Sequence, residues 1–418
     1  MMMTVNPDPL RILYLSFDLT FINPTQQFFR RVLNGAGDLT LFGPGFVSAD
    51  EVDAGPEAFA QRKGPFDIVI GDEFSMLRPG EVPEEKKHLH TFRYYACRFD
   101  ELLIHKGTDY FAFLKKHKGP RFLSLLQSDY YNFKDEHIEK MEEIADYYIA
   151  WGSELLMSKA AASFSSQQLE GMNGKIYDNW NDRYRNYINR HSDRILSTPH
   201  FVADDEFSEL PLNHRAYDWS VLGADYQSRL TAKKLLEEAG ISRSGTYLPY
   251  LFSAAQKLHF HLYNKFWAIR MINVLFGHAL RTSRYSFTCG SLLRYPIRKF
   301  FEIPAAGCVL VTDGCNGFES LGFQDRKNAV VCPPEHILET HEWLTRNPDQ
   351  AQAIATAGRE LVKNTHSVSA RGRQLGESFN RMMKGKFFGT YWSGGRLHFH
   401  ENPAGAVQEP DGTSTGAD

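Results

Sequence analysis

The chain has 418 residues, of which 47 are basic and 50 acidic, and 42% of its residues are apolar. These values are typical of a globular protein and exclude a chain that is fibrous or disordered throughout. The formal net charge of −3 gives no general attraction to nucleic acid or to acidic membranes. At roughly 150 residues per domain, the length predicts two or three domains, each with its own core.

Targeting signals and cysteine usage favour a cytoplasmic protein. The N-terminal sequence has no basic segment followed by a long apolar run, so we expect no secretory signal. No apolar stretch approaches the roughly 18 residues that span a membrane. The five cysteines are odd in number and form no CxxC pair, which favours reduced thiols over a disulfide framework or a zinc ribbon. They are Cys97, Cys289, Cys308, Cys315 and Cys332.

Short apolar segments alternate with amphipathic ones through the first third of the chain. We predict strands at residues 11–17, 39–42, 66–70, 121–126, 147–151 and 194–197. Helices are expected after the start signal Asn23-Pro24-Thr25 and over residues 109–118 and 133–145. This alternation predicts a parallel sheet covered on both faces. Residues 157–191 fit the rhythm poorly and are interpreted as an insertion or a long loop with a helix.

A second alternating unit follows a linker-like segment at residues 204–215. Strands are predicted at 217–223, 286–289, 309–312 and 329–332, and helices at 226–239, 260–278, 297–306, 335–346, 349–364 and 369–384. We therefore predict an α/β fold with two doubly wound, Rossmann-like domains at residues 1–205 and 216–366. A C-terminal helix and return segment would occupy residues 367–395, and a disordered tail residues 396–418.

Ligands of open parallel sheets bind at the carboxyl ends of the strands. Two such sheets in one chain imply a cleft between domains, with a different ligand contributed by each side. This arrangement suits a transferase.

The most informative stretch is RYPIRKFFEIPAAGCVLVT at residues 294–312. Arg294, Arg298 and Glu302 are spaced four apart and share a face if the segment is helical. Their guanidinium groups, with the ammonium of Lys299, could hold a diphosphate, and Glu302 could accept the hydroxyls of a ribose. The alternative is an exposed Arg298–Glu302 ion pair contributing only about 0.3–0.5 kcal/mol. Pro304 should kink or shorten the helix.

The run from residue 217 to about 366 resembles the C-terminal domain of GT-B glycosyltransferases, in particular the CgeB-like branch of the retaining superfamily. Residues 298–312 match the pattern R-x-F-E-x-x-A-x-G-x-x-L-x-T with one extra residue, and a strand ending in Gly223 is followed by Arg229. A second pattern, NP…IA-x-AG-x-x-x-V-x-x-x-H-[ST], is matched by Asn347-Pro348, Ile354-Ala355, Ala357-Gly358, Val362 and His366-Ser367. The N-terminal half matches only as a general α/β domain.

The resemblance implies a GT-B architecture with an acceptor-side first domain and a second domain that binds a nucleotide-diphosphate sugar. It implies that Glu302 holds the ribose, that Arg298 and Arg229 contact the diphosphate, and that Gly223 lets the backbone approach the phosphates. Many retaining relatives carry another glutamate eight positions before the ribose-binding one. Arg294 stands there in this chain. Recognition of the sugar and the stereochemical outcome therefore stay open, and Arg294 is a further candidate phosphate contact.

On the acceptor side, the candidates are carboxylates that follow predicted strands. Asp18 follows the first strand and Asp129 the fourth, so both should face the cleft. Either could be the general base toward an acceptor hydroxyl, and Asp129 is preferred. The alternative for Asp129 and its neighbour Ser128 is helix capping.

Metal-binding signals are weak. HxH pairs occur at 88–90, 259–261 and 398–400, but no cluster of cysteines or carboxylates completes a ligand set. Asp204-Asp205 is interpreted as surface. We expect neither a metal nor a cofactor, because arginine and lysine can supply the charge that the leaving diphosphate needs.

The leading hypothesis is a metal-independent glycosyltransferase that moves a sugar from a nucleotide donor to a glycan, a lipid-linked or a protein acceptor. The alternatives are a non-catalytic GT-B-like scaffold, a nucleotide-sugar epimerase and, least favoured, a DNA-modifying transferase. We expect no nucleic-acid partner, because no basic stripe is evident. The cationic aromatic segment at residues 259–284 is a candidate for peripheral contact with the inner face of the membrane, and a buried helix is the alternative.

Overall fold

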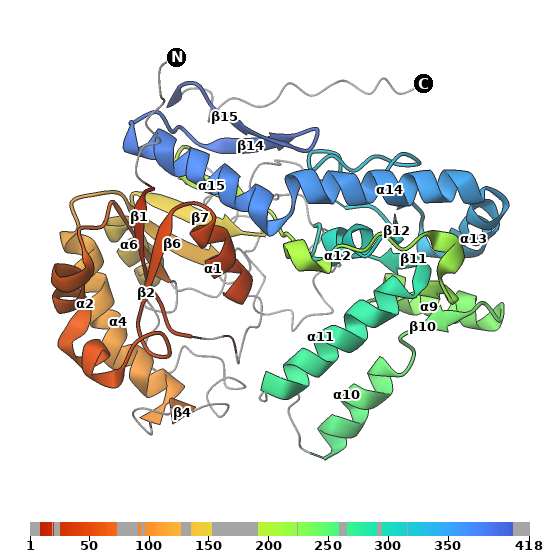
Figure 1. Cartoon of the computed structure of the whole chain (residues 1–418), viewed down its shortest axis with the longest axis horizontal. Helices are drawn as coiled ribbons and strands as arrows, with labels where there is room; N and C mark the ends of the chain where they lie inside the picture. The colour runs from red at the N-terminus through yellow and green to blue at the C-terminus, as the bar shows by residue number, and fades with distance from the viewer. Residues whose placement is uncertain are drawn as a thin grey trace.

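A computed structural model shows the chain folded around two parallel sheets (Figure 1). The structure describes residues 9–18, 20, 26–72, 91–92, 97–126, 135–152, 191–223, 225–258, 266–290, 295–315 and 317–403. Figure 1 shows the sheets in two lobes, the first coloured red to yellow and the second green to blue. Among the described residues, no helix combines the length and apolar character needed to cross a membrane.

The first lobe contains a six-stranded parallel sheet in the order β2-β1-β3-β6-β7-β8. Its strands are β1 (Arg11–Leu15), β2 (Asp38–Phe42), β3 (Ile68–Asp72), β6 (Arg121–Leu126), β7 (Tyr147–Trp151) and β8 (Ile195–Thr198). The helices between them are α1 (Gln26–Asn34), α2 (Ala49–Lys63), α4 (Phe99–Lys116) and α6 (Asp135–Ile144). A small antiparallel pair, β4 (Thr91–Phe92) and β5 (Cys97–Arg98), precedes α4.

The second lobe contains a five-stranded parallel sheet in the order β10-β9-β11-β12-β13. Its strands are β9 (Tyr217–Ser220), β10 (Arg243–Ser244), β11 (Ser283–Thr288), β12 (Val309–Thr312) and β13 (Val330–Val331). The helices are α9 (Gln227–Glu238), α10 (Leu248–Lys257), α11 (Phe266–Arg281), α12 (Lys299–Ala305), α13 (Ile337–Arg346) and α14 (Pro348–Thr365). Short 3-10 turns are η4 (Asp204–Glu206), η5 (Leu212–His214) and η7 (Pro334–His336).

The predicted fold class, two doubly wound parallel α/β sheets, is confirmed. The bounds of β6, β7 and β12 are those expected from the sequence, and α12 ends one residue after Pro304. Some elements were not predicted: α2, α10, β10, the amino-terminal half of α4 and a C-terminal hairpin. Residues 157–190 of the expected insertion lie outside the described residues. Of the tail expected to be disordered at 396–418, residues 396–399 form a strand of that hairpin, and residues 404–418 lie outside the described residues.

The C-terminal helix α15 (Val368–Met383) returns to the first lobe. Its Leu375 and Phe379 share a core with Ile12 and Phe122 of the first sheet, and it packs along α1. The hairpin of β14 (Thr390–Ser393) and β15 (Arg396–Phe399) then pairs antiparallel next to β8. The chain therefore crosses between the lobes twice.

The two crossings pair with each other through their backbones. The amide of Val202 donates to the carbonyl of His366 at 3.1 Å, and the amide of Val368 donates to the carbonyl of Val202 at 2.8 Å. The carboxylate of Asp204 then accepts from the amide and the hydroxyl of Ser369. These bonds fix one passage of the chain against the other.

A buried arginine lies beside this pairing. Arg371 is 1% exposed, and its Nη2 donates to His366 Nδ1 at 3.0 Å and to the His200 carbonyl at 3.4 Å. Its guanidinium also lies 4.7 Å from the ring centre of Trp392 in the hairpin. His366 Nε2 donates to the Leu321 carbonyl at 2.9 Å, so its ring is neutral, with Nδ1 as the acceptor.

Burial and the positive charge of Arg371 hold the pKa of His366 at about 3. Burial, Arg298 and Arg371 together hold the pKa of His200 at about 4. Both pKa values lie below the ordinary histidine pKa of about 6.5. As the pH falls below that value, these histidines therefore bind protons in the unfolded chain but stay neutral in the folded chain. Acid should therefore destabilise this junction.

We expect the free energy of unfolding to fall between pH 6.5 and pH 4, by at most about 1.4 kcal/mol per pH unit for each histidine. Urea unfolding at stepped pH measures it. His200→Gln should flatten the pH dependence by about one proton. The same slope in this variant as in the wild type would contradict the assignment.

Candidate functional site

The candidate site lies where the strand order of the second sheet reverses. With the order β10-β9-β11-β12-β13, the chain leaves β9 and β11 toward opposite sides, and ligands of such sheets bind in the crevice outside the carboxyl ends of these two strands. Residues 221–223 follow β9 and residues 289–290 follow β11. Four of the predicted residues, Gly223, Arg229, Lys299 and Glu302, are placed at or near this point.

At Gly223, two cationic side chains come very close to the backbone. Its φ of 107° is one that residues with a side chain rarely adopt. A Cβ placed on it would lie 2.7 Å from Lys299 Cε. The same Cβ would lie 3.0 Å from Lys299 Nζ and 3.0 Å from Arg229 Nη1. Two cationic side chains therefore end against this bare stretch of backbone.

Arg229 comes from the first turn of α9. It is 1% exposed, its guanidinium lies 5.2 Å from the ring centre of Tyr226, and its Nη2 donates to Thr288 Oγ1 at 3.1 Å. Thr288 is the last residue of β11, so this bond ties α9 to the carboxyl end of the neighbouring strand. The guanidinium is thus held at the switch point.

Lys299 is the first residue of α12. Burial lowers its pKa, the nearby guanidiniums of Arg229 and Arg298 lower it further, and the carboxylate of Glu302 acts against them. Its ammonium lies 5.0 Å from the ring centre of Phe276, and it forms an ion pair with none of the described carboxylates. A half-buried cation in this position favours an anionic ligand.

Arg298, predicted to contact phosphate, is bound to two carboxylates in this structure. Its Nη2 donates to both oxygens of Glu206, at 2.7 and 2.9 Å, and its Nε lies 3.3 Å from Glu302 Oε1. The expected ion pair with Glu302 is therefore present, but it is half-buried rather than exposed. The guanidinium also lies 4.2 Å from the ring centre of Phe28 in α1, so Arg298 joins the two lobes.

The carboxylates respond to this environment. Burial raises the pKa of Glu206, Glu302 raises it further, and Arg298 opposes both. Burial alone would lower the pKa of Arg298, but Glu302 and Glu206 outweigh it and raise the value. Sequence reasoning missed Glu206, because it lies in the segment interpreted as a linker. The available signal was its place in an acidic run, residues 204–206, that follows the apolar residues 201–203.

Asp18 lies at the carboxyl end of β1, as expected, but it already has partners. Its carboxylate accepts from Thr20 Oγ1 at 2.8 Å and lies 3.6 Å from Arg30 Nη2. Its amide donates to the Pro44 carbonyl, in the loop that follows β2. The two remaining predicted site residues, Asp129 and Arg294, lie outside the described residues.

Among the described residues, no group of three or more histidine, cysteine, aspartate or glutamate side chains is arranged to hold a metal ion. Of the three HxH pairs, only His398 and His400 are described, and both pack against the ring of Tyr391. Asp204 and Asp205 are exposed, as expected. Cys289, Cys308, Cys315 and Cys332 are thiols that are not joined in disulfides.

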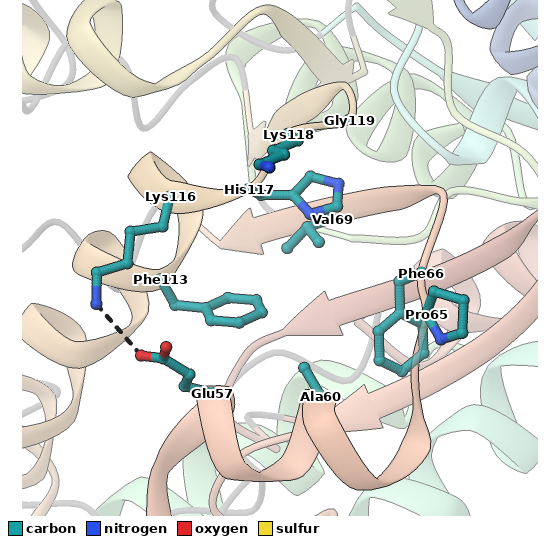
Figure 2. A pocket seen from close by; sticks show the side chains of 10 residues that line it. All are labelled: Glu57, Ala60, Pro65, Phe66, Val69, Phe113, Lys116, His117, Lys118 and Gly119. Atoms are coloured by element: carbon teal, nitrogen blue, oxygen red, sulfur yellow. Dashed lines mark hydrogen bonds and ion pairs between the residues drawn. The ribbon is translucent and has the colours of Figure 1, made fainter.

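A separate cavity of about 400 Å³ lies in the first lobe (Figure 2). Pro65 and Phe66 line it just before β3, and Lys118 and Gly119 just before β6. It is therefore at the amino ends of these strands, opposite to the edge where α/β sheets bind ligands. Figure 2 shows the ion pair between Lys116 and Glu57, at 3.2 Å, at its rim. This cavity is not part of the candidate site.

Comparison with protein families supports a glycosyltransferase. Residues 251–377 match a family model described as glycosyl transferase-like. The matched segment contains Arg298, Lys299 and Glu302, and it begins after Gly223 and Arg229. A comparison with curated proteins found no match.

The solved structures to which this chain is similar include the following three proteins. HepE of Anabaena with UDP has a TM-score of 0.48 at 8% identity over 89% of this chain and 100% of its own. Sucrose-phosphate synthase of Thermosynechococcus elongatus has a TM-score of 0.46 at 10% identity, over 90% of this chain and 100% of its own. A Listeria monocytogenes protein described as a putative UDP-N-acetylglucosamine 2-epimerase has a TM-score of 0.41 at 11% identity, over 90% of this chain and 97% of its own. The two predicted parallel α/β sheets are present in the structure itself, whereas likenesses this distant decide neither architecture nor activity nor ligand.

The Arg298–Glu206 pair is expected to stabilise the protein far more than an exposed pair. Glu206→Gln removes the charged acceptor from a half-buried guanidinium and should lower the free energy of unfolding by about 2 kcal/mol. The matched control is Glu342→Gln, whose partner Arg346 lies at 3.0 Å. There the side chains are 76% and 62% exposed, against 21% and 35% for Arg298 and Glu206, so the loss should stay below about 0.5 kcal/mol. Equal losses in urea unfolding would contradict this prediction.

Proposed function

We propose that the chain is a glycosyltransferase that uses a nucleoside-diphosphate sugar as donor, in the CgeB-like branch that the sequence resembles. The observation that carries the proposal is the pair of cations, Arg229 and Lys299, held against the bare backbone of Gly223 at the switch point of the second sheet. The match of residues 251–377 to a glycosyl transferase-like model supports it independently.

The cations would act on the leaving group. As the bond between the anomeric carbon and the diphosphate oxygen breaks, its electron pair stays on that oxygen, and negative charge grows there. A fixed cation about 4 Å away, at the effective dielectric constant of a protein surface, offsets on the order of 4 kcal/mol of this cost. Because arginine and lysine supply the charge, the proposed reaction is metal-independent.

Glu302 would bind the nucleoside end of the donor. A carboxylate at this place in a dinucleotide-type fold accepts hydrogen bonds from the ribose hydroxyls. Arg298 Nε, at 3.3 Å, holds one of its oxygens. We therefore assign Arg298 the role of a positioning residue for Glu302, because its Nη2 is already bound to Glu206.

On the acceptor side, the acceptor oxygen forms the new bond to the anomeric carbon and loses its proton to a base. Asp18 and Asp129 are our candidates for that base. Asp18 has the right place, at a carboxyl strand end, although Thr20 and Arg30 share its carboxylate. We propose a glycan, a lipid-linked or a protein acceptor. We also propose a retaining outcome, in which the acceptor oxygen attacks from the face that the diphosphate leaves, because attack from the opposite face would invert the anomeric carbon.

A panel of UDP, GDP, ADP, TDP and CMP in thermal-shift and calorimetric titrations tests the donor site. We expect one nucleoside diphosphate, at 100 times its dissociation constant, to add about 2.7 kcal/mol of stability to the wild type. Lys299→Met and Glu302→Ala should lose this gain. Lys234→Met, which changes an exposed lysine of α9, should keep it.

Binding alone does not separate the possible activities. Transfer to an added acceptor supports the proposal, and interconversion of a nucleotide sugar without acceptor would identify an epimerase. Tight binding without either reaction would favour the scaffold hypothesis, which rests on Arg294 in place of a glutamate. If no nucleotide binds, the donor-site assignment fails.

Gly223→Ala tests the close approach itself. The new Cβ would displace Lys299, so we expect affinity for the nucleoside diphosphate to fall at least about tenfold. Gly240→Ala is the matched control, because Gly240 also has a positive φ, of 67°, but nothing lies within 4 Å of its added Cβ. Both variants should lose about 1 kcal/mol of stability from backbone strain. Unchanged affinity in Gly223→Ala, measured by calorimetry, would refute the site.

A further inference from the structure

Helices α10 and α11 form a pair that projects from the second lobe (Figure 1). They pack on each other through a small core of their own, in which Leu251 and Ala255 of α10 meet Ala268 and Ile272 of α11. This core is separate from the cores on the two faces of the sheet. The pair therefore presents most of its outer surface to solvent.

That outer surface is unusually apolar. Among the described residues, ten large hydrophobic side chains are exposed, and five of them belong to this helix pair and its immediate flanks. They are Tyr247 (41%), Tyr250 (77%), Leu258 (78%), Trp267 (57%) and Val274 (57%). Exposed tyrosine and tryptophan with aliphatic neighbours are the residues that proteins place at a membrane–water interface.

The exposed residues of α11 share one helical stripe. Trp267, Arg270, Val274, His278 and Arg281 are exposed at spacings of three and four, whereas the buried residues lie on the opposite face. On α10, exposed Tyr250 and Lys257 are seven apart and share a stripe in the same way. Each stripe combines aromatic or aliphatic side chains with cations.

The stretch of sequence that contains both helices carries charge of only one sign. From residue 239 to residue 301 the sequence has nine basic residues and no acidic residue. The whole chain has 50 acids in 418 residues, so a segment of this length would ordinarily hold about seven. A segment without carboxylates, carrying exposed arginine and lysine, is complementary to a negatively charged partner.

We propose that the α10–α11 pair is a docking surface for an anionic lipid bilayer. The exposed rings and aliphatic side chains would enter the interface, and Lys257, Arg270 and Arg281 would pair with lipid phosphates. The sequence left a choice between membrane contact and a buried helix, and the exposure of Trp267 and Val274 favours the membrane. The proposal does not depend on glycosyl transfer.

Co-sedimentation of the full chain with vesicles tests the surface. We expect binding to vesicles of phosphatidylcholine with about one-third phosphatidylglycerol, weak binding to phosphatidylcholine alone, and loss at high salt. Arg270→Glu and Trp267→Ser should each lower the partition coefficient about fivefold or more. Tyr250→Ser repeats the apolar test on the other helix.

Two matched controls change the same residue types elsewhere. Arg346→Glu and Tyr391→Ser alter an exposed arginine and an exposed tyrosine outside this surface and should bind as the wild type does. The proposal is overturned if anionic vesicles do not bind the wild type, if neutral vesicles bind equally well, or if the controls lose binding to the same extent. It is also overturned if sedimentation without lipid shows a dimer that Trp267→Ser dissociates, because the surface would then cover a second copy. Melting temperatures of all variants check that each is folded.

Discussion

The backbone pairing of the two interlobe crossings is the constraint on which the rest of the structure depends. Val202 exchanges hydrogen bonds with His366 and Val368, so residues 202 and 367 cannot move independently. Glu206 follows this pairing directly, and the short 3-10 turn there delivers its carboxylate to Arg298. The joint between the lobes therefore also sets the charge balance next to the candidate site.

That charge balance divides the cations into two groups. Arg298 is matched by two carboxylates, whereas Lys299, one residue later, forms an ion pair with no described carboxylate. Arg298 together with its two carboxylates carries no net positive charge, so in the proposed donor site the diphosphate would be drawn toward Lys299 and Arg229, over Gly223. Glu302 adjoins both groups, since it pairs with Arg298 and opposes the lowering of the Lys299 pKa. The carboxylate of Glu302 therefore lies between the proposed donor site and the joint between the lobes, in contact with a cation that belongs to that joint.

The sequence predicted the sheets because buried parallel strands are continuous apolar runs, as in β7 and β12. The sequence did not predict α2, because Gly55 and Pro56 interrupt its helical pattern. The hairpin β14–β15 was missed although Gly394-Gly395 between two short strands is a turn signal. In the site, the family resemblance singled out Gly223 and Arg229, and the cationic run at residues 294–302 singled out Lys299. The structure brings the three together. Glu206 stayed hidden, because its contact with a residue 92 positions away depends on how the crossings pair.

Helix α11 connects the two proposals physically. Its amino-terminal half carries exposed Trp267 and Arg270, and its Phe276 lies against the ammonium of Lys299. Nine residues of helix separate Trp267 from Phe276, which is a rise of about 14 Å. A bilayer that held the exposed stripe would therefore lie within about 14 Å, along the helix, of the ring that packs on a donor-site cation. A rigid helix of this length transmits a tilt imposed at one end to the other. Among the acceptors considered, a lipid-linked one fits this proximity best, because it would be presented at the surface that the same helix contacts.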